Sequence, residues 1–170
     1  MKNYSGFTLL ELLITVAVIA IAMAIAVPSM REFTQNDRLT TNINTFIGHL
    51  ALARSEAVKR SQQVGVCVSN DAASCTGGNW EDGWIIYIDA DATNSFSAGE
   101  EILRAQQALD GGNTLTPAGI GSQIIYDYRG FVDAGSVGSF LLCDIRSGDF
   151  GKTVRITTTG RVRLEVDSTC

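Results

Sequence analysis

The stretch LLELLITVAVIAIAMAIAV, from Leu9 to Val27, decides the fold of this 170-residue chain, because it is apolar apart from Glu11, Thr15 and small alanines. An α-helix rises about 1.5 Å per residue, so roughly 20 apolar residues are needed to cross a bilayer. The stretch therefore predicts a membrane-spanning helix. Because Lys2 is the only basic residue ahead of it, we expect the N-terminal end to stay in the cytoplasm and the remaining chain to lie outside.

The residues after the apolar stretch argue against a cleaved secretory signal. Such a signal has a shorter apolar core followed by a cleavage site of small residues, whereas here Pro28 and a polar helical pattern follow directly. We expect Pro28 to end the apolar run and to kink or restart the helix. Apolar residues then recur at helical steps, which predicts an amphipathic helix with one face on a core. They are Leu39, Ile43, Phe46, Leu50, Ala53 and Ala57.

Beyond this helix the pattern changes to the alternation that is typical of β-strands. We expect the helix to end near residues 61–65, and strands to follow at 64–68, 84–88, 102–103, 123–126, 140–142, 153–156 and 161–166. The predicted fold class is α+β, with a long N-terminal helix, first transmembrane and then amphipathic, packed on an antiparallel β-sheet head.

Composition and charge exclude several classes of protein. The chain has 13 Lys and Arg against 18 Asp and Glu, for a formal net charge of -5, which is opposite to the basic footprint of a dedicated nucleic-acid binder. His49 is the only histidine, and no phosphate loop, dinucleotide-binding or nucleophile-elbow motif is present. We therefore expect no enzyme activity and no cofactor. We interpret His49, three residues after Phe46, as a packing residue at the edge of the helix.

The string GFTLLELL, from Gly6 to Leu13 after a short basic leader, resembles the class III signal of type IV pilins and type II secretion pseudopilins. The resemblance implies that a prepilin peptidase cuts after Gly6, that the new amino terminus at Phe7 is methylated, and that Glu11 becomes the fifth mature residue. It also implies four regions. These are a leader at 1–6, a transmembrane segment at 7–28, an amphipathic helix at 29–63 and a β-rich head at 64–170.

Glu11 is the residue that a plain membrane anchor does not explain, since an acidic side chain at the centre of a membrane helix costs about 2.5–3.5 kcal/mol. One interpretation places Glu11 near the membrane surface, where its side chain reaches water. The pilin resemblance gives Glu11 a role in filament assembly instead. Residues i and i+4 share a helix face, and the amine of Phe7 from a neighbouring subunit would neutralise the carboxylate.

Two further segments, ARSEAVKR at 53–60 and NWEDGW at 79–84, resemble the GspH/FimT class of minor pilins and pseudopilins. That resemblance implies a minor subunit of a type IV filament that assembles at or near the tip. The precursor would be a single-pass protein of the bacterial inner membrane, with its head in the periplasm. Its partners would be the prepilin peptidase and other major and minor pilins or pseudopilins. The alternative within the family is a type II secretion minor pseudopilin that supports protein export.

The cysteines predict an oxidising compartment. Four cysteines allow three pairings, and none has the C-x-x-C spacing of a zinc or thiol redox site. We expect two structural disulfides, with Cys67–Cys75 closing a short loop and Cys143–Cys170 tying the chain end to the sheet. Such bonds form outside the cytoplasm, which agrees with the predicted membrane topology.

The stretch DADATNSFSAGE, at 89–100, has oxygen-bearing side chains at the spacing of a calcium-binding loop. Against calcium, Asn94 replaces the glycine that makes the sharp turn of such a loop, and the preceding segment is a predicted strand instead of a helix. We favour an acidic hairpin loop and assign no metal. If calcium bound here, its ligands would be Asp89, Asp91, Thr93, Ser95 and Glu100.

Basic residues gather on the C-terminal hairpin. Strand alternation sends Arg155, Arg161 and Arg163 outward together, and guanidinium groups offer forked donors that suit phosphate oxygens. With Lys152 they form a candidate site for the DNA backbone. The same alternation sends the apolar residues of the hairpin inward, namely Val154, Ile156, Val162, Leu164 and Val166.

The string GRVR, at 160–163, resembles the Gly-Arg-x-Arg element of FimT-like pilins that bind double-stranded DNA during natural transformation. The alternative is an edge hairpin whose outward arginines only meet solvent or pair with acids such as Glu165. No aromatic residue lies between these arginines in the sequence, which argues against stacking of bases from a single strand. Any DNA binding is expected to be weak, salt-sensitive and independent of sequence.

Overall fold

The structure, a computed structural model, describes residues 8–170, except for the side chains of residues 166 and 167. Gly6 and Phe7, the predicted cleavage and methylation residues, lie outside this range. The chain divides into two compact units, Met1–Asp37 and Arg38–Cys170, and helix α1 (Leu9–Arg60) contributes to both. Among the described residues, every buried hydrophobic side chain belongs to the second unit. This unit is the head.

Helix α1 begins with a capping interaction. Oγ1 of Thr8 accepts a hydrogen bond from the backbone N–H of Glu11 at 3.2 Å, which satisfies one of the donors that the first turn of a helix leaves free. Pro28 lies inside α1, which is assigned as one helix from Leu9 to Arg60. The expectation that Pro28 restarts the helix is therefore wrong. A proline removes one hydrogen bond of the helix, and the turns on either side keep theirs.

The C-terminal end of α1 falls at Arg60, earlier than the predicted boundary at residue 63. The N–H of Gln62 donates to the carbonyl of Ala57 at 3.3 Å, and the N–H of Ser61 donates to the carbonyl of Val58 at 3.4 Å. This pair of bonds is a common helix ending, in which one residue takes a left-handed conformation. Ser61, with φ of 54°, takes that position, and the chain turns into the first strand.

The head contains two four-stranded antiparallel sheets, which confirms the predicted fold class. The strand order is β3-β2-β1-β5 in the first sheet and β4-β6-β7-β8 in the second. The strands are β1 (Gln63–Val68), β2 (Gly83–Asp89), β3 (Ile102–Gln107), β4 (Thr114–Ala118), β5 (Gln123–Tyr126), β6 (Gly138–Cys143), β7 (Gly151–Ile156) and β8 (Val162–Ser168). Short 3₁₀ helices occur at η1 (Trp80–Asp82), η2 (Asp110–Gly112) and η3 (Ala134–Ser136).

Strand β4 is the element that the sequence pattern does not predict. Its sequence, TLTPA, has one buried apolar residue, Leu115, and contains Pro117. A proline cannot donate a ladder hydrogen bond and is tolerated mainly on an edge strand. β4 is indeed the first strand of its sheet and pairs only with β6.

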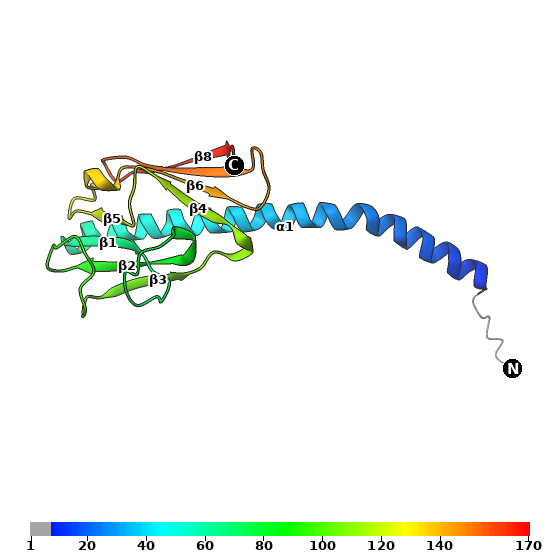
Figure 1. The fold of residues 1–170 in the computed structure, drawn as a ribbon, viewed down its shortest axis with the longest axis horizontal. Helices are drawn as coiled ribbons and strands as arrows, with labels where there is room; N and C mark the ends of the chain where they lie inside the picture. Colours follow the sequence, from blue (N-terminus) through cyan, green and yellow to red (C-terminus); the bar gives the residue numbers. More distant parts are fainter. Residues whose placement is uncertain (1–7) are drawn as a thin grey trace. The chain divides into compact units, whose positions relative to one another are not determined.

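The predicted apolar stripe of α1 packs on the core of the head. Phe46 is at its centre, with edge-on ring contacts to Trp80, Trp84 and Phe140 at centroid distances of 6.0, 5.1 and 4.8 Å. These rings come from η1, from the first sheet and from the second sheet, so one side chain joins all three. The C-terminal part of α1 runs alongside the strands of both sheets (Figure 1). The stripe is confirmed residue by residue, since each member is at most 1% exposed: Leu39, Ile43, Phe46, Leu50, Ala53 and Ala57.

Candidate functional site

The N-terminal part of α1 is an apolar surface that no other described residue of the chain covers. All residues from Leu9 to Thr34 are exposed, and α1 is long and apolar enough, by length and composition, to cross a membrane. Glu11 is exposed on the first turn of this surface. Its backbone N–H is held by Thr8, as described above, while its carboxylate makes no hydrogen bond or ion pair to the described residues.

The two disulfides expected from the sequence are present. Cys67, in β1, is bonded to Cys75, and Cys143, at the end of β6, is bonded to Cys170, with Cα–Cα distances of 5.6 and 5.8 Å. The first closes the loop that precedes η1. The second attaches the end of the chain beyond β8, the outermost strand of its sheet, to β6.

The loop at 89–100 holds its carboxylates close together. One oxygen each of Asp89, Asp91 and Glu100 lie within 4.8 Å of one another. Burial raises the pKa of Asp89, and a hydrogen bond from the Thr93 hydroxyl lowers the pKa of Asp91. The carboxylates already accept hydrogen bonds within the loop: Asp89 from the N–H groups of Thr93 and Asn94, and Glu100 from those of Ala90 and Ser97.

These hydrogen bonds give the carboxylates a structural role, because they stabilise the backbone of an acidic hairpin loop between β2 and β3. The hydroxyl of Ser95, another candidate calcium ligand, contacts the hydroxyl of Thr93 at 3.1 Å. Asn94 adopts a positive φ of 60° where a calcium loop has glycine. The arrangement therefore gives no reason beyond the acids themselves to assign a metal.

Arg155 and Arg163 face each other across the β7–β8 pair. Nε of Arg155 donates to Oε1 of Glu165 at 3.1 Å, and this hydrogen bond raises the pKa of Arg155. Both side chains of the ion pair are about half exposed, so the pair contributes little to stability. The charge of Arg155 is thus matched by an acid, which agrees with the alternative interpretation for this one residue.

Lys152 does not belong with the arginines. It lies two residues before the buried Val154 on β7, so that strand alternation places it on the opposite face of the sheet from Arg155. The predicted group of four basic residues is therefore reduced to three. Leu164 also departs from expectation. It is opposite Val154 but 42% exposed, because β8 is the outermost strand of its sheet.

Arg161 lies just before β8, in the turn that begins at Thr157. The N–H of Thr157 donates to the carbonyl of Arg161 at 3.1 Å, and the N–H of Gly160 donates to the carbonyl of Thr157 at 2.8 Å. Arg161 and Arg163 are both exposed. Within the described part of the chain, neither has an acid within 4.0 Å, since every ion pair found involves other residues.

The glycine of the GRVR string is required by the fold. Gly160 has a positive φ of 69°, a conformation that favours glycine. A side chain at this position would collide with the carbonyl of Gly130 and touch the ring of Tyr126. The position of Gly160 therefore has a structural explanation, whereas Arg161 and Arg163 have none.

Sequence reasoning missed the loop that Gly160 touches. Residues 127–131, directly after β5, carry Tyr128 and Phe131, which are 56% and 44% exposed. The guanidinium carbon of Arg129 is 5.4 Å from the centroid of each ring, and Nη2 of Arg129 donates to Asp127 at 2.8 Å. The exposed aromatics within DYRGF were visible in the sequence, but their contact with the arginine turn was not.

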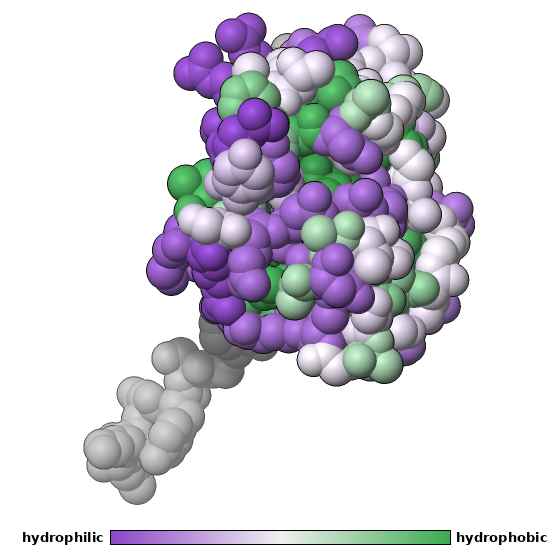
Figure 2. Space-filling view, turned by 90° about the vertical axis from the view of Figure 1, so that its left-hand side faces the viewer, coloured by the Kyte–Doolittle hydropathy of each residue, from purple (hydrophilic) through white to green (hydrophobic). Residues whose placement is uncertain are grey.

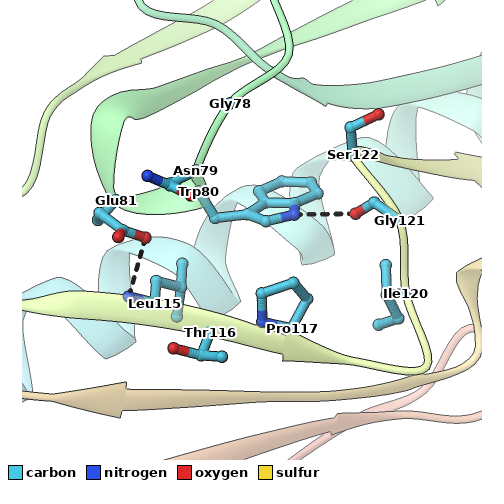
Figure 3. Close-up of a pocket in the computed structure, with 10 residues that line it drawn as sticks. All are labelled: Gly78, Asn79, Trp80, Glu81, Leu115, Thr116, Pro117, Ile120, Gly121 and Ser122. Carbon is cyan, nitrogen blue, oxygen red and sulfur yellow. Dashed lines mark hydrogen bonds between the residues drawn. The ribbon is translucent and has the colours of Figure 1, made fainter.

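A small cavity of about 270 Å³ lies between η1 and the segment from β4 to β5 (Figure 3). Nε1 of Trp80 donates to the carbonyl of Gly121 at 3.0 Å across it, and the N–H of Leu115 donates to Glu81 at 3.4 Å. Glu81 is the only ionisable residue in its lining. The cavity therefore lacks the paired groups of an acid–base centre.

Comparison with known proteins gives two family matches. The family described as "Type II transport protein GspH" matches residues 42–160, and the one described as "Prokaryotic N-terminal methylation motif" matches residues 1–27. The pilin-like protein PilA1 of Thermus thermophilus is 27% identical over 169 residues, which covers 94% of this chain and 97% of that protein. A fimbrial protein of Pseudomonas aeruginosa is 34% identical over 64 residues. The latter match spans 41% of the length of that relative.

Solved structures have the same fold. The type IV minor pilin FimU of Pseudomonas aeruginosa superimposes with a TM-score of 0.61 at 20% identity, covering 81% of this chain and 95% of FimU. The minor pseudopilin EpsH, from the type II secretion system of Vibrio cholerae, gives 0.56 at 14% identity, covering 78% of this chain and 99% of EpsH. Since the GspH match covers well over half of the residues and the methylation motif covers the apolar N-terminus, the chain belongs to the GspH family of type II transport proteins and has the N-terminal methylation motif.

Proposed function

We propose that this chain is cleaved after Gly6 in the bacterial inner membrane and enters a type IV filament through the N-terminal part of α1. The observation that supports this is the run of exposed apolar side chains from Leu9 to Val27, on which Glu11 is the only charged group. A bilayer covers such a surface before assembly. In the filament, the corresponding helices of neighbouring subunits replace the lipid, while the head, with its two disulfides, is folded in the periplasm.

Glu11 supplies the polar contact of this assembly. Pairing with the amine of Phe7 in a neighbouring subunit would neutralise a carboxylate that an apolar surrounding disfavours. Glu11→Ala and Glu11→Gln are expected to leave the head folded and the precursor processed, yet to hold the subunit in the membrane fraction. Glu32→Gln, at an exposed acid beyond the apolar run of the same helix, is the matched control. Recovery of the Glu11 variants in sheared filaments at the wild-type level contradicts this role.

The processing itself has a direct test. Intact mass measurement of the protein from sheared filaments is expected to show loss of residues 1–6 and one methyl group on Phe7. Blocking cleavage by Gly6→Leu is expected to leave the longer precursor in the membrane. An unprocessed chain in filaments would refute the assignment of Gly6 and Phe7.

We place the subunit at or near the filament tip, with other minor pilins. Support comes from its relatives, since both FimU and EpsH are described as minor subunits. Immunogold labelling of the head is expected at filament ends, and label spread along the shaft would contradict a tip position. The type II secretion alternative has its own signature, because deletion would then deplete exported proteins. Deletion in a pilus system would impair motility and leave the secretome unchanged.

DNA binding by the C-terminal hairpin is a second candidate function. The observation that favours it is that Arg161 and Arg163 are exposed and have no described acid within 4.0 Å, in a protein whose net charge is -5. Forked guanidinium donors suit backbone phosphates. Contact with phosphates alone carries no sequence information, so binding is expected to be non-specific and strongly dependent on salt.

A gel-shift titration of the full chain in neutral detergent against duplex DNA tests this function. Wild-type binding is expected to fall with salt, with a log–log slope of about -0.9 per phosphate neutralised. Arg161→Ala/Arg163→Ala is expected to abolish binding, whereas Arg104→Ala, at an exposed arginine on β3, is expected to leave it intact. Absence of wild-type binding at low salt would assign the arginines to solvation of the hairpin.

A further inference from the structure

Two surface segments that are distant in the sequence meet at the end of the head where α1 ends (Figure 1). They are the loop at 127–131 and the β7–β8 turn at 157–161. The carbonyl of Gly130 lies directly against Gly160, where no side chain would fit. One residue beyond the loop, the N–H of Val132 donates to the carbonyl of Thr158 at 3.1 Å. Backbone contacts thus fix the two segments to each other.

Helix α1 also contacts this junction between the loop at 127–131 and the turn at 157–161. Nε of Arg54 donates to the carbonyl of Gly130 at 3.0 Å, and a side chain at Gly130 would touch both Arg54 and Val58. Gly130 has a positive φ of 79°, which glycine adopts at no steric cost. The loop is therefore anchored at Gly130, and its aromatic residues on either side remain at the surface.

The exposed groups at this junction are planar. Tyr128 and Phe131 are both roughly half exposed, and the guanidinium of Arg129 lies 5.4 Å from the centre of each ring. Figure 2 views this end of the head and shows hydrophobic side chains at the surface among hydrophilic ones. Exposed aromatic rings are platforms on which nucleic-acid bases of any sequence stack.

The charge at the junction is positive. Arg129 is matched by Asp127, but Arg54 donates to a carbonyl, and Arg161, next to Gly160, has no acid within 4.0 Å among the described residues. Among the described residues, the guanidinium groups of Arg54 and Arg161 thus have no counter-charge at this junction. A nucleic acid needs this combination, with rings for its bases and unmatched cations for its phosphates.

We infer that Tyr128, Arg129, Phe131 and Arg161, here called the aromatic–arginine surface, bind single-stranded DNA. Bases stack on the two rings, and Arg161 contacts the adjacent phosphates. The inference rests on the DNA binding proposed above and names the form of DNA that the site takes. It also revises the expectation from the sequence that single-stranded bases do not stack here, because folding brings aromatic residues of another segment to the turn.

The rings favour single-stranded over duplex DNA because the bases of a duplex are stacked on one another, so that their faces cannot contact the rings. A duplex can use only the phosphate contacts, whereas an unpaired strand can use both phosphates and rings. Loss of the rings must therefore weaken single-strand binding without a change in its salt dependence. Loss of Arg161 must lower the salt slope, by about one for each phosphate contact, for both forms of DNA.

Fluorescence anisotropy of the full chain in neutral detergent, with an oligothymidylate and a blunt-ended duplex, separates these contributions. Tyr128→Leu/Phe131→Leu keeps apolar bulk and removes the rings. We expect it to weaken oligothymidylate binding about fivefold or more at an unchanged salt slope, and to leave duplex binding unchanged. Phe150→Leu is the matched control, because Phe150 is also exposed and has an arginine over its ring, but lies at the other end of β7.

Four outcomes would overturn the inference. If the double leucine variant binds oligothymidylate like the wild type while Arg161→Ala weakens binding, the DNA function stands and the rings have no part in it. If the leucine variant loses both forms of DNA equally, the loop only positions Arg161. If the wild type binds neither form, the DNA function itself fails. A leucine variant that binds both normally but no longer enters filaments would make the surface a contact between subunits.

Discussion

His49 accepts a hydrogen bond from Nε1 of Trp84 at 3.0 Å through Nδ1, which confirms its interpretation as a packing residue. Burial, and secondly the charge of Arg104, lower the pKa of His49 below its usual value. The unfolded chain, with a histidine pKa of about 6.5, therefore binds a proton more readily than the folded chain. The free energy of unfolding must fall as the pH drops below the unfolded pKa.

Because His49 is the only histidine, its contribution can be isolated. We expect the urea midpoint of the wild type to decrease between about pH 7.5 and pH 6, the range in which an unperturbed histidine titrates. His49→Gln, which keeps an acceptor and cannot titrate in this range, is expected to show no such decrease. An equal decrease in both proteins would assign the pH dependence to other groups.

At the scale of elements, two glycines in regular structure should respond oppositely to alanine. Gly48 lies in α1 with open space around it, so Gly48→Ala is expected to stabilise the head by about 0.5–1 kcal/mol. Gly65 lies in β1, where a side chain would collide with the ring of Tyr87, so Gly65→Ala is expected to destabilise the head by about 1–3 kcal/mol. Denaturant unfolding followed by tryptophan fluorescence measures both, and a stable Gly65→Ala variant would contradict the close contact.

Elements with a strong period were predictable, whereas β4, an edge strand without such a period, was not. The stripe from Leu39 to Ala57 could be identified because burial on one side of a helix produces a regular spacing. Strand β4 was not predicted because an edge strand that contains Pro117 requires neither alternating apolar and polar residues nor a full set of backbone hydrogen-bond donors. Likewise, the exposure of the Leu164 side chain depends on how far the core extends beneath β8. The alternation of residues along one strand gives no information about this.

At the scale of the whole molecule, some features of the candidate site could likewise be predicted from the sequence and others could not. The exposure of Arg161 and Arg163 followed from local pattern, and both disulfide pairings favoured among the three possibilities are present. The pairing of Arg155 with Glu165 was foreseen only as an alternative. The contact between Gly130 and Gly160 joins residues that are far apart in the sequence, and no periodicity or motif encodes such a tertiary contact.

The Cys143–Cys170 bond stabilises the head at this same scale. It closes a loop with a sequence separation of 27, for which loss of unfolded-state entropy corresponds to roughly 3–4 kcal/mol. Cys143→Ser/Cys170→Ser is expected to lower the free energy of unfolding by up to this amount, as measured by urea unfolding under oxidising conditions. Reductant is expected to lower the stability of the wild type further, because it also opens Cys67–Cys75. Equal stability of the variant and the wild type would contradict a structural role for the bond.

The same bond has a mechanical consequence. β8 is held in its sheet by hydrogen bonds to β7 alone, and a strand on the margin of a sheet detaches one hydrogen bond at a time when it is peeled from its end. Tension applied to the chain end would otherwise open β8 in this manner. The disulfide bond between Cys170 and Cys143 transmits that force directly to β6, which lies two strands into the sheet. The hairpin that carries Arg161 and Arg163 can therefore be pulled without separation of its strands.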